Sequence, residues 1–274
     1  MKKCLLLVLI YILASFKLSA MERNDSTDGA LIEIKTTMGD IDILLYNDTP
    51  LHKENFLKLV KDVFYEDLLF HRVINNFMIQ GGDPDSKNAP AGKMLGAGNP
   101  GYTVEAEIDY PKHYHKYGAL AAARTGDAMN PERRSSGSQF YIVTGNKYTP
   151  AQLNGMVSQR LMSKKQNMFS RLVAENRDSL NAMRERGDEA GFNDLKNQLI
   201  ERVEKEIKEE SLPEAIFSDY TTVGGTPHLD GEYTVFGEVI KGMDTVEKIQ
   251  KVETDHNNRP VEDIKILSVK ILKE

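Results

Sequence analysis

The segment FHRVINNFMIQGGD, residues 70–83, places one arginine, Arg72, among apolar side chains and ends with the adjacent glycines Gly81 and Gly82. A guanidinium is always protonated and donates hydrogen bonds from a rigid planar fork, and burying it unpaired is costly. Arg72 is therefore either neutralised by a core carboxylate in a structural ion pair or kept as a cationic hydrogen-bond donor for a ligand. The two glycines predict a backbone turn at the end of the segment.

Two other patterns that could carry chemistry are weaker. The stretch GAGNPG, residues 96–101, has the glycine spacing of a dinucleotide-binding loop. Such a loop must open a helix, whereas Pro100 interrupts this one and Tyr102–Val104 looks extended, so a flexible surface loop is predicted. The stretch SSGSQF lacks the G-x-S-x-G turn of a nucleophilic serine, and no Ser/His/Asp order accompanies it.

Metal binding is not predicted. Asp83 and Asp85 lack the ligand spacing and the distal glutamate of an EF-hand loop. His113 and His115 are two residues apart on a predicted loop. They are interpreted as surface residues rather than as metal ligands.

The elements that position these residues are mainly strands, because short runs rich in β-branched or alternating apolar residues recur along the chain. The predicted strands are Leu31–Thr36, Ile41–Tyr46, Phe70–Ile74, Met78–Gly81, Tyr117–Ala122, Gln139–Val143, Tyr233–Ile240 and Ile264–Ile271. One helix is predicted after the N-cap Thr49, with Pro50 in its first position. Another is predicted around Asp244–Gln250.

The segment between the sixth and seventh strands has a different character. Residues 158–211 contain no proline and equal numbers of basic and acidic residues. Two apolar stripes with helical spacing flank a break at Arg186–Asp188, which predicts two antiparallel helices. Their members are Phe169, Val173, Asn176, Leu180 and Met183, followed by Phe192, Leu195, Leu199, Val203 and Ile207. Because strands resume afterwards, residues 150–220 are interpreted as a helical insertion into one β domain, residues 30–274.

Composition narrows the range of functions. The chain has 274 residues, 40% of them apolar and 28% charged, which is typical of a globular protein. Its net charge of −6 argues against a nucleic-acid partner, which would require a basic face.

The first residues look like a signal for export. Lys2 and Lys3 precede the apolar run Cys4–Phe16, and small residues follow at Ser19 and Ala20. This pattern predicts a signal peptide over residues 1–20. The run is shorter than the roughly 20 residues of a membrane span, although an uncleaved anchor is the alternative. Residues 21–29 are predicted to be a disordered linker, and the mature protein is expected in the periplasm or another extracytoplasmic space, without membrane contact.

Three stretches occur in a fixed order: FHRVINNFMIQGGD, SSGSQFYIVTG and HLDGEYTVFGEVIKGMD. Together they resemble the cyclophilin family of peptidyl-prolyl cis–trans isomerases, over roughly residues 30–147 and 222–274. The resemblance implies an eight-stranded antiparallel β-barrel capped by two helices, which agrees with the strand-rich pattern. The N-terminal signal and the helical insertion are similar to those of secreted bacterial cyclophilins.

The resemblance implies a reaction in which no covalent bond breaks. Rotation about an X–Pro bond faces a barrier of about 18–20 kcal/mol set by amide resonance. On twisting, the amide nitrogen regains a lone pair that can accept a hydrogen bond, and the family assigns its donor to Arg72. Neither a metal nor a cofactor is expected, and the partners are proline-containing polypeptides.

The remaining site residues also follow from the resemblance. Gln80 would orient Arg72, and Gln139 would hydrogen-bond the substrate backbone. The proline pocket and the groove beside it would use Phe77, Met78, Ala123, the main chain of Arg124, Tyr141, His228, Leu229 and Tyr233. His228, Tyr233, Tyr141 and Arg124 stand where many eukaryotic members have tryptophan, histidine, phenylalanine and asparagine. The missing tryptophan argues against tight cyclosporin binding but not against catalysis.

The insertion leaves alternatives open. It could make the protein an extracytoplasmic chaperone or scaffold that binds clients, with the isomerase site incidental. Its apolar stripes could instead be buried between its own helices or against the barrel. Self-association through the insertion is a third interpretation, in which Asn176 would fix the register of the contact.

Overall fold

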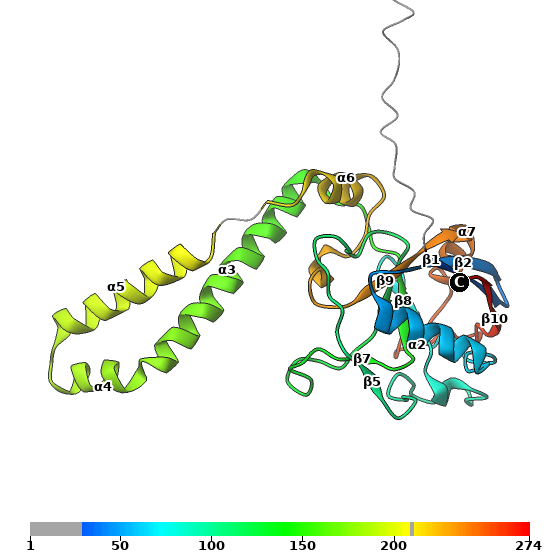
Figure 1. Cartoon of the computed structure of the whole chain (residues 1–274), viewed down its shortest axis with the longest axis horizontal. Helices are drawn as coiled ribbons and strands as arrows, with labels where there is room; N and C mark the ends of the chain where they lie inside the picture. The colour runs from blue at the N-terminus through cyan, green and yellow to red at the C-terminus, as the bar shows by residue number, and fades with distance from the viewer. Residues whose placement is uncertain (1–28, 209–210) are drawn as a thin grey trace, which may run out of the picture.

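The computed structural model describes residues 29–208 and 211–274, which form a β-barrel and a long helical arm that projects from it (Figure 1). The predicted signal peptide and nearly all of the predicted linker lie outside the described residues. Gly29, assigned to the linker from the sequence, instead opens the first strand.

Eight strands form one antiparallel sheet in the order β10-β1-β2-β9-β6-β8-β4-β3. They are β1 (Gly29–Thr36), β2 (Gly39–Tyr46), β3 (Arg72–Ile74), β4 (Met78–Gly81), β6 (Ala119–Ala122), β8 (Phe140–Val143), β9 (Val235–Lys241) and β10 (Ile266–Lys273). The two sheet edges meet, because the N–H of Phe70 donates to the carbonyl of Ile264 at 2.9 Å. The predicted eight-stranded barrel is confirmed, and two short strands, β5 (Thr103–Val104) and β7 (Ser135–Ser136), pair separately.

The barrel interior is filled by alternating residues of the strands, as a period of two requires. Ile32, Ile34, Ile41 and Ile43 are fully buried. Helices α2 (Pro50–Lys61) and α7 (Met243–Ile249) add buried side chains such as Phe56 to the same cluster. The two helices predicted to cap the barrel are thus present.

Strands β6 and β8 are buried on both faces. Their inward side chains belong to the barrel core, as for Leu120 and Ile142. Their outward side chains form a second apolar cluster on the barrel surface, with Met78 of β4 and Val235 of β9. This outer cluster contains Met78, Ala119, Ala121, Tyr141, Val143 and Val235, with Phe77, Ala123, Leu229 and Tyr233 packed against it.

The helical arm consists of α3 (Pro150–Glu175), α4 (Arg177–Glu185) and α5 (Glu189–Glu206), followed by α6 (Glu214–Thr222). The predicted break at Arg186–Asp188 is confirmed. The predicted helical hairpin is present, but its first half is divided at Asn176 into α3 and α4, and the short helix α6 was not predicted. Asn176 donates its side-chain N–H to the carbonyl of Leu172 at 2.8 Å, so it terminates a helix of its own arm.

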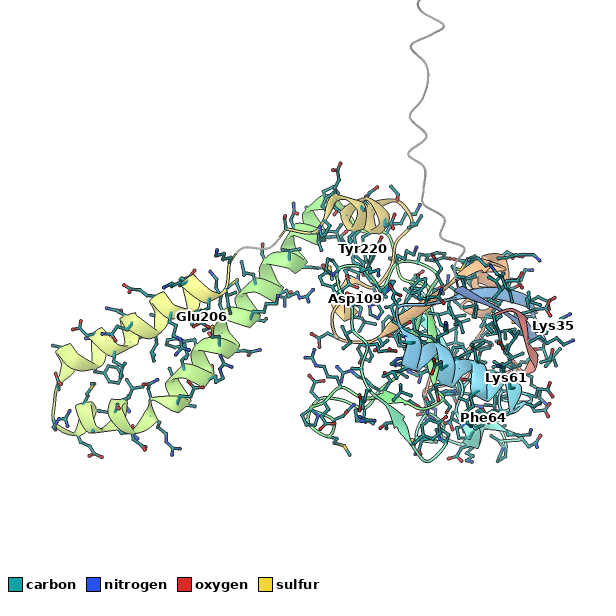
Figure 2. All side chains as sticks on the ribbon, in the orientation of Figure 1. Lys35, Lys61, Phe64, Asp109, Glu206 and Tyr220 are labelled. Carbon is teal, nitrogen blue, oxygen red and sulfur yellow. The ribbon has the colours of Figure 1, made fainter. Side chains whose placement is uncertain are left out.

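The arm has a small apolar core of its own, against which Phe169 and Val173 of the first predicted stripe are only partly buried. Met168 and Leu172 of α3 pack against Leu199 and Val203 of α5, in a cluster separate from the barrel core. Where the arm joins the barrel, Leu153 of α3 packs on Ile216 and Tyr220 of α6 in a further cluster, called the arm root below. Figure 2 shows Tyr220 at the barrel end of the arm and Glu206 well out along it.

No helix among residues 29–208 and 211–274 is long and apolar enough to cross a membrane.

Candidate active site

Arg72 of β3, Gln80 of β4 and Gln139, which directly precedes β8, form a hydrogen-bonded chain. Arg72 of β3 and Gln80 of β4 are direct cross-strand partners. The Arg72 guanidinium donates to the side-chain oxygen of Gln80 at 3.2 Å, and the Gln80 amide donates to that of Gln139 at 2.9 Å. The Gln139 amide in turn donates to the carbonyls of Gly96 and Gly98, at 3.0 and 2.7 Å. The antiparallel register therefore brings together the three residues predicted from separate motifs.

Arg72 is half-buried, and within the described part of the chain no carboxylate lies within ion-pair distance of it. Burial lowers the pKa of the Arg72 guanidinium from its usual range, and a carboxylate neighbour would have countered that shift. The structural ion pair considered from the sequence is therefore not formed. A charged fork held by a neutral amide keeps its remaining donors for another molecule.

The outer apolar cluster lies next to this cation. The nearest contact joins the Arg72 guanidinium to the sulfur of Met78 at 3.8 Å. Tyr141 and Tyr233 meet edge to face at 6.0 Å between ring centres. The ring of His228 stacks on Phe77 at 5.6 Å, in the place where a tryptophan was noted as usual.

A groove of about 560 Å³ adjoins the cation on the side of Gln80 and Gln139. Ala123 and Arg124 form part of its lining, together with the loop of residues 96–101. The GAGNPG stretch opens no helix, as predicted. It is a wall of the groove held by Gln139, a role that its glycine spacing did not indicate.

The side chain of Arg124 is engaged within the protein. Its guanidinium lies 4.6 Å above the ring of Tyr233 and pairs with Asp127 at 2.6 Å. The Nε–H donates to the carbonyl of Glu232 at 2.9 Å. The side chain is thus occupied by contacts within the protein, which is compatible with the predicted use of the main chain of Arg124.

The interpretation of His113 and His115 as surface residues is wrong. His115 is fully buried beneath the outer apolar cluster, where its Nε2 meets the hydroxyl of Tyr141 at 2.9 Å. The side chain of His113 is only 12% exposed and stacks on Tyr46. Both were misjudged because a loop with polar neighbours gives no periodic signal of burial.

A second buried histidine forms an arrangement that resembles a serine triad. His52 contacts Glu107 through Nδ1 at 2.6 Å and Ser135 through Nε2 at 2.9 Å. Glu107 also accepts the main-chain N–H groups of Leu51 and His52 at the start of α2. Ser135 is 1% exposed, so no substrate reaches its hydroxyl. The trio links the helix to β7, which agrees with the absence of a nucleophile motif.

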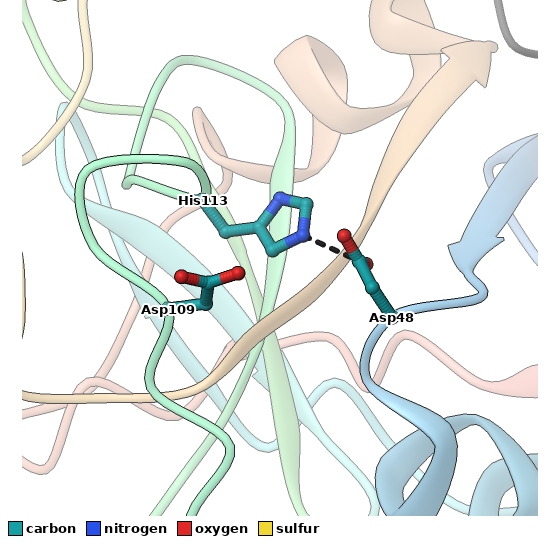
Figure 3. A group of neighbouring side chains, drawn as sticks. All are labelled: Asp48, Asp109 and His113. Atoms are coloured by element: carbon teal, nitrogen blue, oxygen red, sulfur yellow. Dashed lines mark hydrogen bonds and ion pairs between the residues drawn. The ribbon is translucent and has the colours of Figure 1, made fainter.

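Asp48, Asp109 and His113 bring one ligand atom each within 4.8 Å of one another. Figure 3 shows the ring of His113 directed at Asp48, with the Asp109 carboxylate to one side. The ring of His113 hydrogen-bonds to Asp48 at 2.8 Å, and the Lys112 ammonium contacts the same carboxylate. Against the effect of burial, the hydrogen bonds from Lys112 and His113 lower the pKa of Asp48, and a metal ion would have to displace both.

Comparison with known proteins agrees with this geometry. The family model "Cyclophilin type peptidyl-prolyl cis-trans isomerase/CLD" matches residues 31–205 and 217–271. A protein of Staphylococcus aureus named as a peptidyl-prolyl cis–trans isomerase is 30% identical over 241 residues, which cover 88% of this chain and 90% of that protein. A relative from Staphylococcus saprophyticus with the same name is 29% identical over 240 residues, 87% of this chain and 89% of its own. Both alignments are longer than the chain without residues 150–220, so they include part of the arm.

Solved structures show the same fold. The crystal structure of a cyclophilin-type isomerase from Cryptosporidium parvum matches with a TM-score of 0.51 and 21% identity, covering 89% of this chain and 98% of that one. A second structure of that protein, determined in the presence of the dipeptide Ala-Pro, gives a TM-score of 0.50. This chain belongs to the cyclophilin-type peptidyl-prolyl cis–trans isomerase family.

Proposed function

We propose that Arg72 is the catalytic residue of this isomerase and that it acts by donating a hydrogen bond to the nitrogen of a twisting X–Pro amide. The planar amide nitrogen is a poor acceptor, whereas the twisted nitrogen has a localised lone pair. A donor that binds only the twisted form lowers the barrier without stabilising the ground state. The observation that carries the proposal is a half-buried guanidinium that has no carboxylate partner in residues 29–208 and 211–274 and is held by Gln80 beside an apolar wall.

The substrate proline would rest on the outer apolar cluster. Phe77, Met78, Tyr141 and Leu229 supply the apolar surface, and the rings of His228 and Tyr233 extend it. The preceding part of the peptide would lie in the groove, where Ala123 and the main chain of Arg124 line the wall and Gln139 offers its amide. The Ala-Pro dipeptide used with the Cryptosporidium parvum relative supports a proline-containing substrate.

The test is the rate of cis-to-trans exchange in a short X–Pro peptide. Uncatalysed exchange takes tens to hundreds of seconds, so acceleration by the purified protein is readily measured. Arg72→Ala should lower kcat/KM at least about a hundredfold, as expected when a preorganised donor to the transition state is removed. Arg171→Ala, at an exposed position on α3, is the matched control and should keep parental activity. Equal rates for Arg72→Ala and the parent would rule out the proposal.

We further propose that the enzyme accelerates folding of exported proteins outside the cytoplasm, where proline isomerisation limits folding of many chains. The support is the basic, apolar and small-residue order of residues 1–20. Cell fractionation and mass spectrometry of the N-terminus test it. Recovery of the protein in the periplasmic or secreted fraction, with a new N-terminus near Met21, is expected. Recovery with the cytoplasmic marker would contradict it.

A second candidate function is client binding by the arm. A hollow of about 320 Å³ opens between α3, α4 and α5, with apolar side chains surrounded by three cations. It is lined by Phe169, Val173, Arg177, Leu180, Asn181, Arg184, Phe192, Lys196 and Leu199. An unfolded polypeptide segment with apolar and acidic side chains fits this chemistry. Deletion of residues 158–211 should then abolish suppression of client aggregation while peptide isomerisation persists. If the deletion variant still suppresses aggregation, the arm is not the client-binding site.

A further inference from the structure

Four buried polar side chains connect the arm root to the proposed proline pocket. The hydroxyl of Tyr220 on α6 donates to one oxygen of Asp230 at 2.7 Å. The other oxygen of Asp230 accepts from the main-chain N–H of His115 at 2.9 Å and meets its ring Nδ1 at 3.1 Å. His115 Nε2 meets the Tyr141 hydroxyl at 2.9 Å. All four residues are at most 5% exposed.

The donors and acceptors in this chain have a fixed direction. A carboxylate only accepts, so Tyr220 donates to Asp230 and the proton of His115 is on Nδ1. In the neutral imidazole Nε2 is then an acceptor, and the hydroxyl of Tyr141 must donate to it. Burial strengthens each of these hydrogen bonds. It also makes an unpaired polar group costly in free energy, so each of the four side chains restricts the position of its neighbour.

The main chain reinforces the same link. The segment that leaves α6 pairs with the backbone at His115 and Tyr117: the N–H of Thr226 donates to the carbonyl of His115 at 2.8 Å, and the N–H of Tyr117 donates to the carbonyl of Gly224 at 2.9 Å. Gly225 has no room for a side chain, because a Cβ there would clash with the carbonyl of His115 and the ring of Tyr220. The end of the insertion is therefore built into the support of the pocket.

We propose that Tyr220, Asp230 and His115 are positioning residues that fix the ring of Tyr141, so that the arm root sets the shape of the proline pocket. This inference rests on the proposed assignment of the pocket. Tyr141 directs its hydroxyl inward to His115, which leaves its ring for the outer apolar cluster. Where phenylalanine occupies this position no such anchor exists, so the device belongs to chains that combine the tyrosine with the buried histidine and α6.

The test is a double-mutant cycle on KM and kcat for a short X–Pro peptide. Tyr220→Phe removes one hydroxyl and keeps the aromatic packing of the arm root. It should raise KM about three- to tenfold with a smaller change in kcat, because binding to a loosened wall suffers first. In the Tyr141→Phe background the same substitution should change KM less than twofold, since the connection is already cut.

Tyr114→Phe is the matched control. Tyr114 packs edge to face on Tyr220, but its hydroxyl bonds to Asp219, outside the chain of four. It should leave KM unchanged in both backgrounds. Deletion of residues 158–211 keeps α6 and should also leave KM unchanged. An unchanged KM for Tyr220→Phe, or an equal effect in both backgrounds, would overturn the inference.

Two further readouts separate the possible failures. If the parent is active and Arg72→Ala is not, the proposed catalytic role of Arg72 stands whatever Tyr220→Phe does. If Tyr220→Phe does not fold, ¹⁵N NMR of His115 in the parent decides. A proton on Nδ1 supports the chain of four, and a proton on Nε2 with Nδ1 bare excludes it.

Discussion

At the scale of single residues, the proposed site holds the Arg72 cation in a fixed direction through Gln80, without a carboxylate partner among the described residues. A carboxylate partner would hold Arg72 more tightly but would also neutralise its field and occupy its donors. Gln80 supplies an oxygen without a charge, and Gln139 fixes Gln80 in turn. Half-burial raises the strength of each remaining donor, because fewer water molecules compete for it.

Replacing Gln80 tests this arrangement. In Gln80→Leu the guanidinium loses its anchor while the volume of the side chain is nearly kept. Loss of a hydrogen bond to a charged group typically costs about 1.5–3 kcal/mol. If that loss falls on the transition state, kcat/KM for a short X–Pro peptide should fall between about tenfold and a hundredfold. Gln166→Leu, an exposed substitution on α3, should leave kcat/KM at the parental value; a parental value for Gln80→Leu would show that Arg72 needs no anchor.

His71, the neighbour of Arg72, gives the protein a specific response to acid. Burial lowers its pKa from 6.5 to about 4, against the opposing attraction of Asp83. His71 is therefore protonated near pH 6.5 in the unfolded chain but only near pH 4 in the folded protein. Stability is complete above pH 6.5 and falls as the pH decreases towards 4, by about 3 kcal/mol from this group.

Urea unfolding at several pH values measures that contribution. Carboxylates also titrate in this range, so the informative quantity is the difference between the parent and His71→Gln. The variant should lose less stability than the parent between pH 7 and pH 4. His256→Gln, at an exposed histidine, should follow the parent curve. Parallel curves for the parent and His71→Gln would refute a buried, neutral His71.

How far sequence reasoning reached differs within the site. Arg72, Gln80, Phe77 and Gln139 were predicted as site residues because they lie in stretches with a family resemblance. His115 and Asp230 were missed as functional neighbours because their contact joins residues far apart in the chain. Tyr141 was predicted as a pocket residue and as a departure from phenylalanine, but the role of its hydroxyl becomes apparent only once its partner His115 is known. The tyrosine itself indicated that a hydrogen-bond partner should exist, but the sequence does not show which residue that partner is.

At the scale of elements, the strands were predictable and the arm was less so. Alternation and β-branched runs gave the barrel strands to within a few residues, as for β2 and β8. The kink at Asn176 was not predicted because the apolar stripe runs through it without a change of period. Helix α6 was missed because it is short and follows Pro213 directly, where only an end to the preceding helix was expected.

The turn after β4 shows why the second of the two adjacent glycines, Gly82, is needed. Gly82 has φ +87°, and a Cβ there would clash with the carbonyl of Ser138. Gly92 has a similar φ of +77° but open space around it. Gly82→Ala should therefore lower the free energy of unfolding by about 3 kcal/mol or more, from left-handed strain and overpacking together. Gly92→Ala should cost only about 1–2 kcal/mol, from the strain alone.

Urea denaturation of the two variants separates these contributions. The crowded site lies between β4 and the chain entering β8, which carry Gln80 and Tyr141. A Gly82→Ala protein that folds should thus also show reduced isomerisation, whereas Gly92→Ala should keep it. Equal stability losses in the two variants would mean that the backbone around Ser138 yields to the added methyl group.

At the scale of the whole molecule, the barrel and the arm differ in what stabilises them. The barrel core joins eight strands and two helices around fully buried isoleucines. The arm has a separate, small cluster formed by Met168, Leu172, Leu199 and Val203. Its surface ion pairs, such as Lys165 with Glu204, contribute little in water. The two parts share the arm root, but their cores do not touch.

Separate cores predict separate unfolding. Amides of α4 and α5 should exchange with solvent orders of magnitude faster than amides of β1 and β2, because opening the arm exposes only its small cluster. Hydrogen exchange followed by mass spectrometry measures this directly on the full chain. A protein lacking residues 158–211 should show unchanged protection in β1, β2 and α6, since the arm root stays intact. Arm amides as protected as those of β1 would instead show one cooperative unit, and the arm would then act on the pocket as a whole rather than through its root.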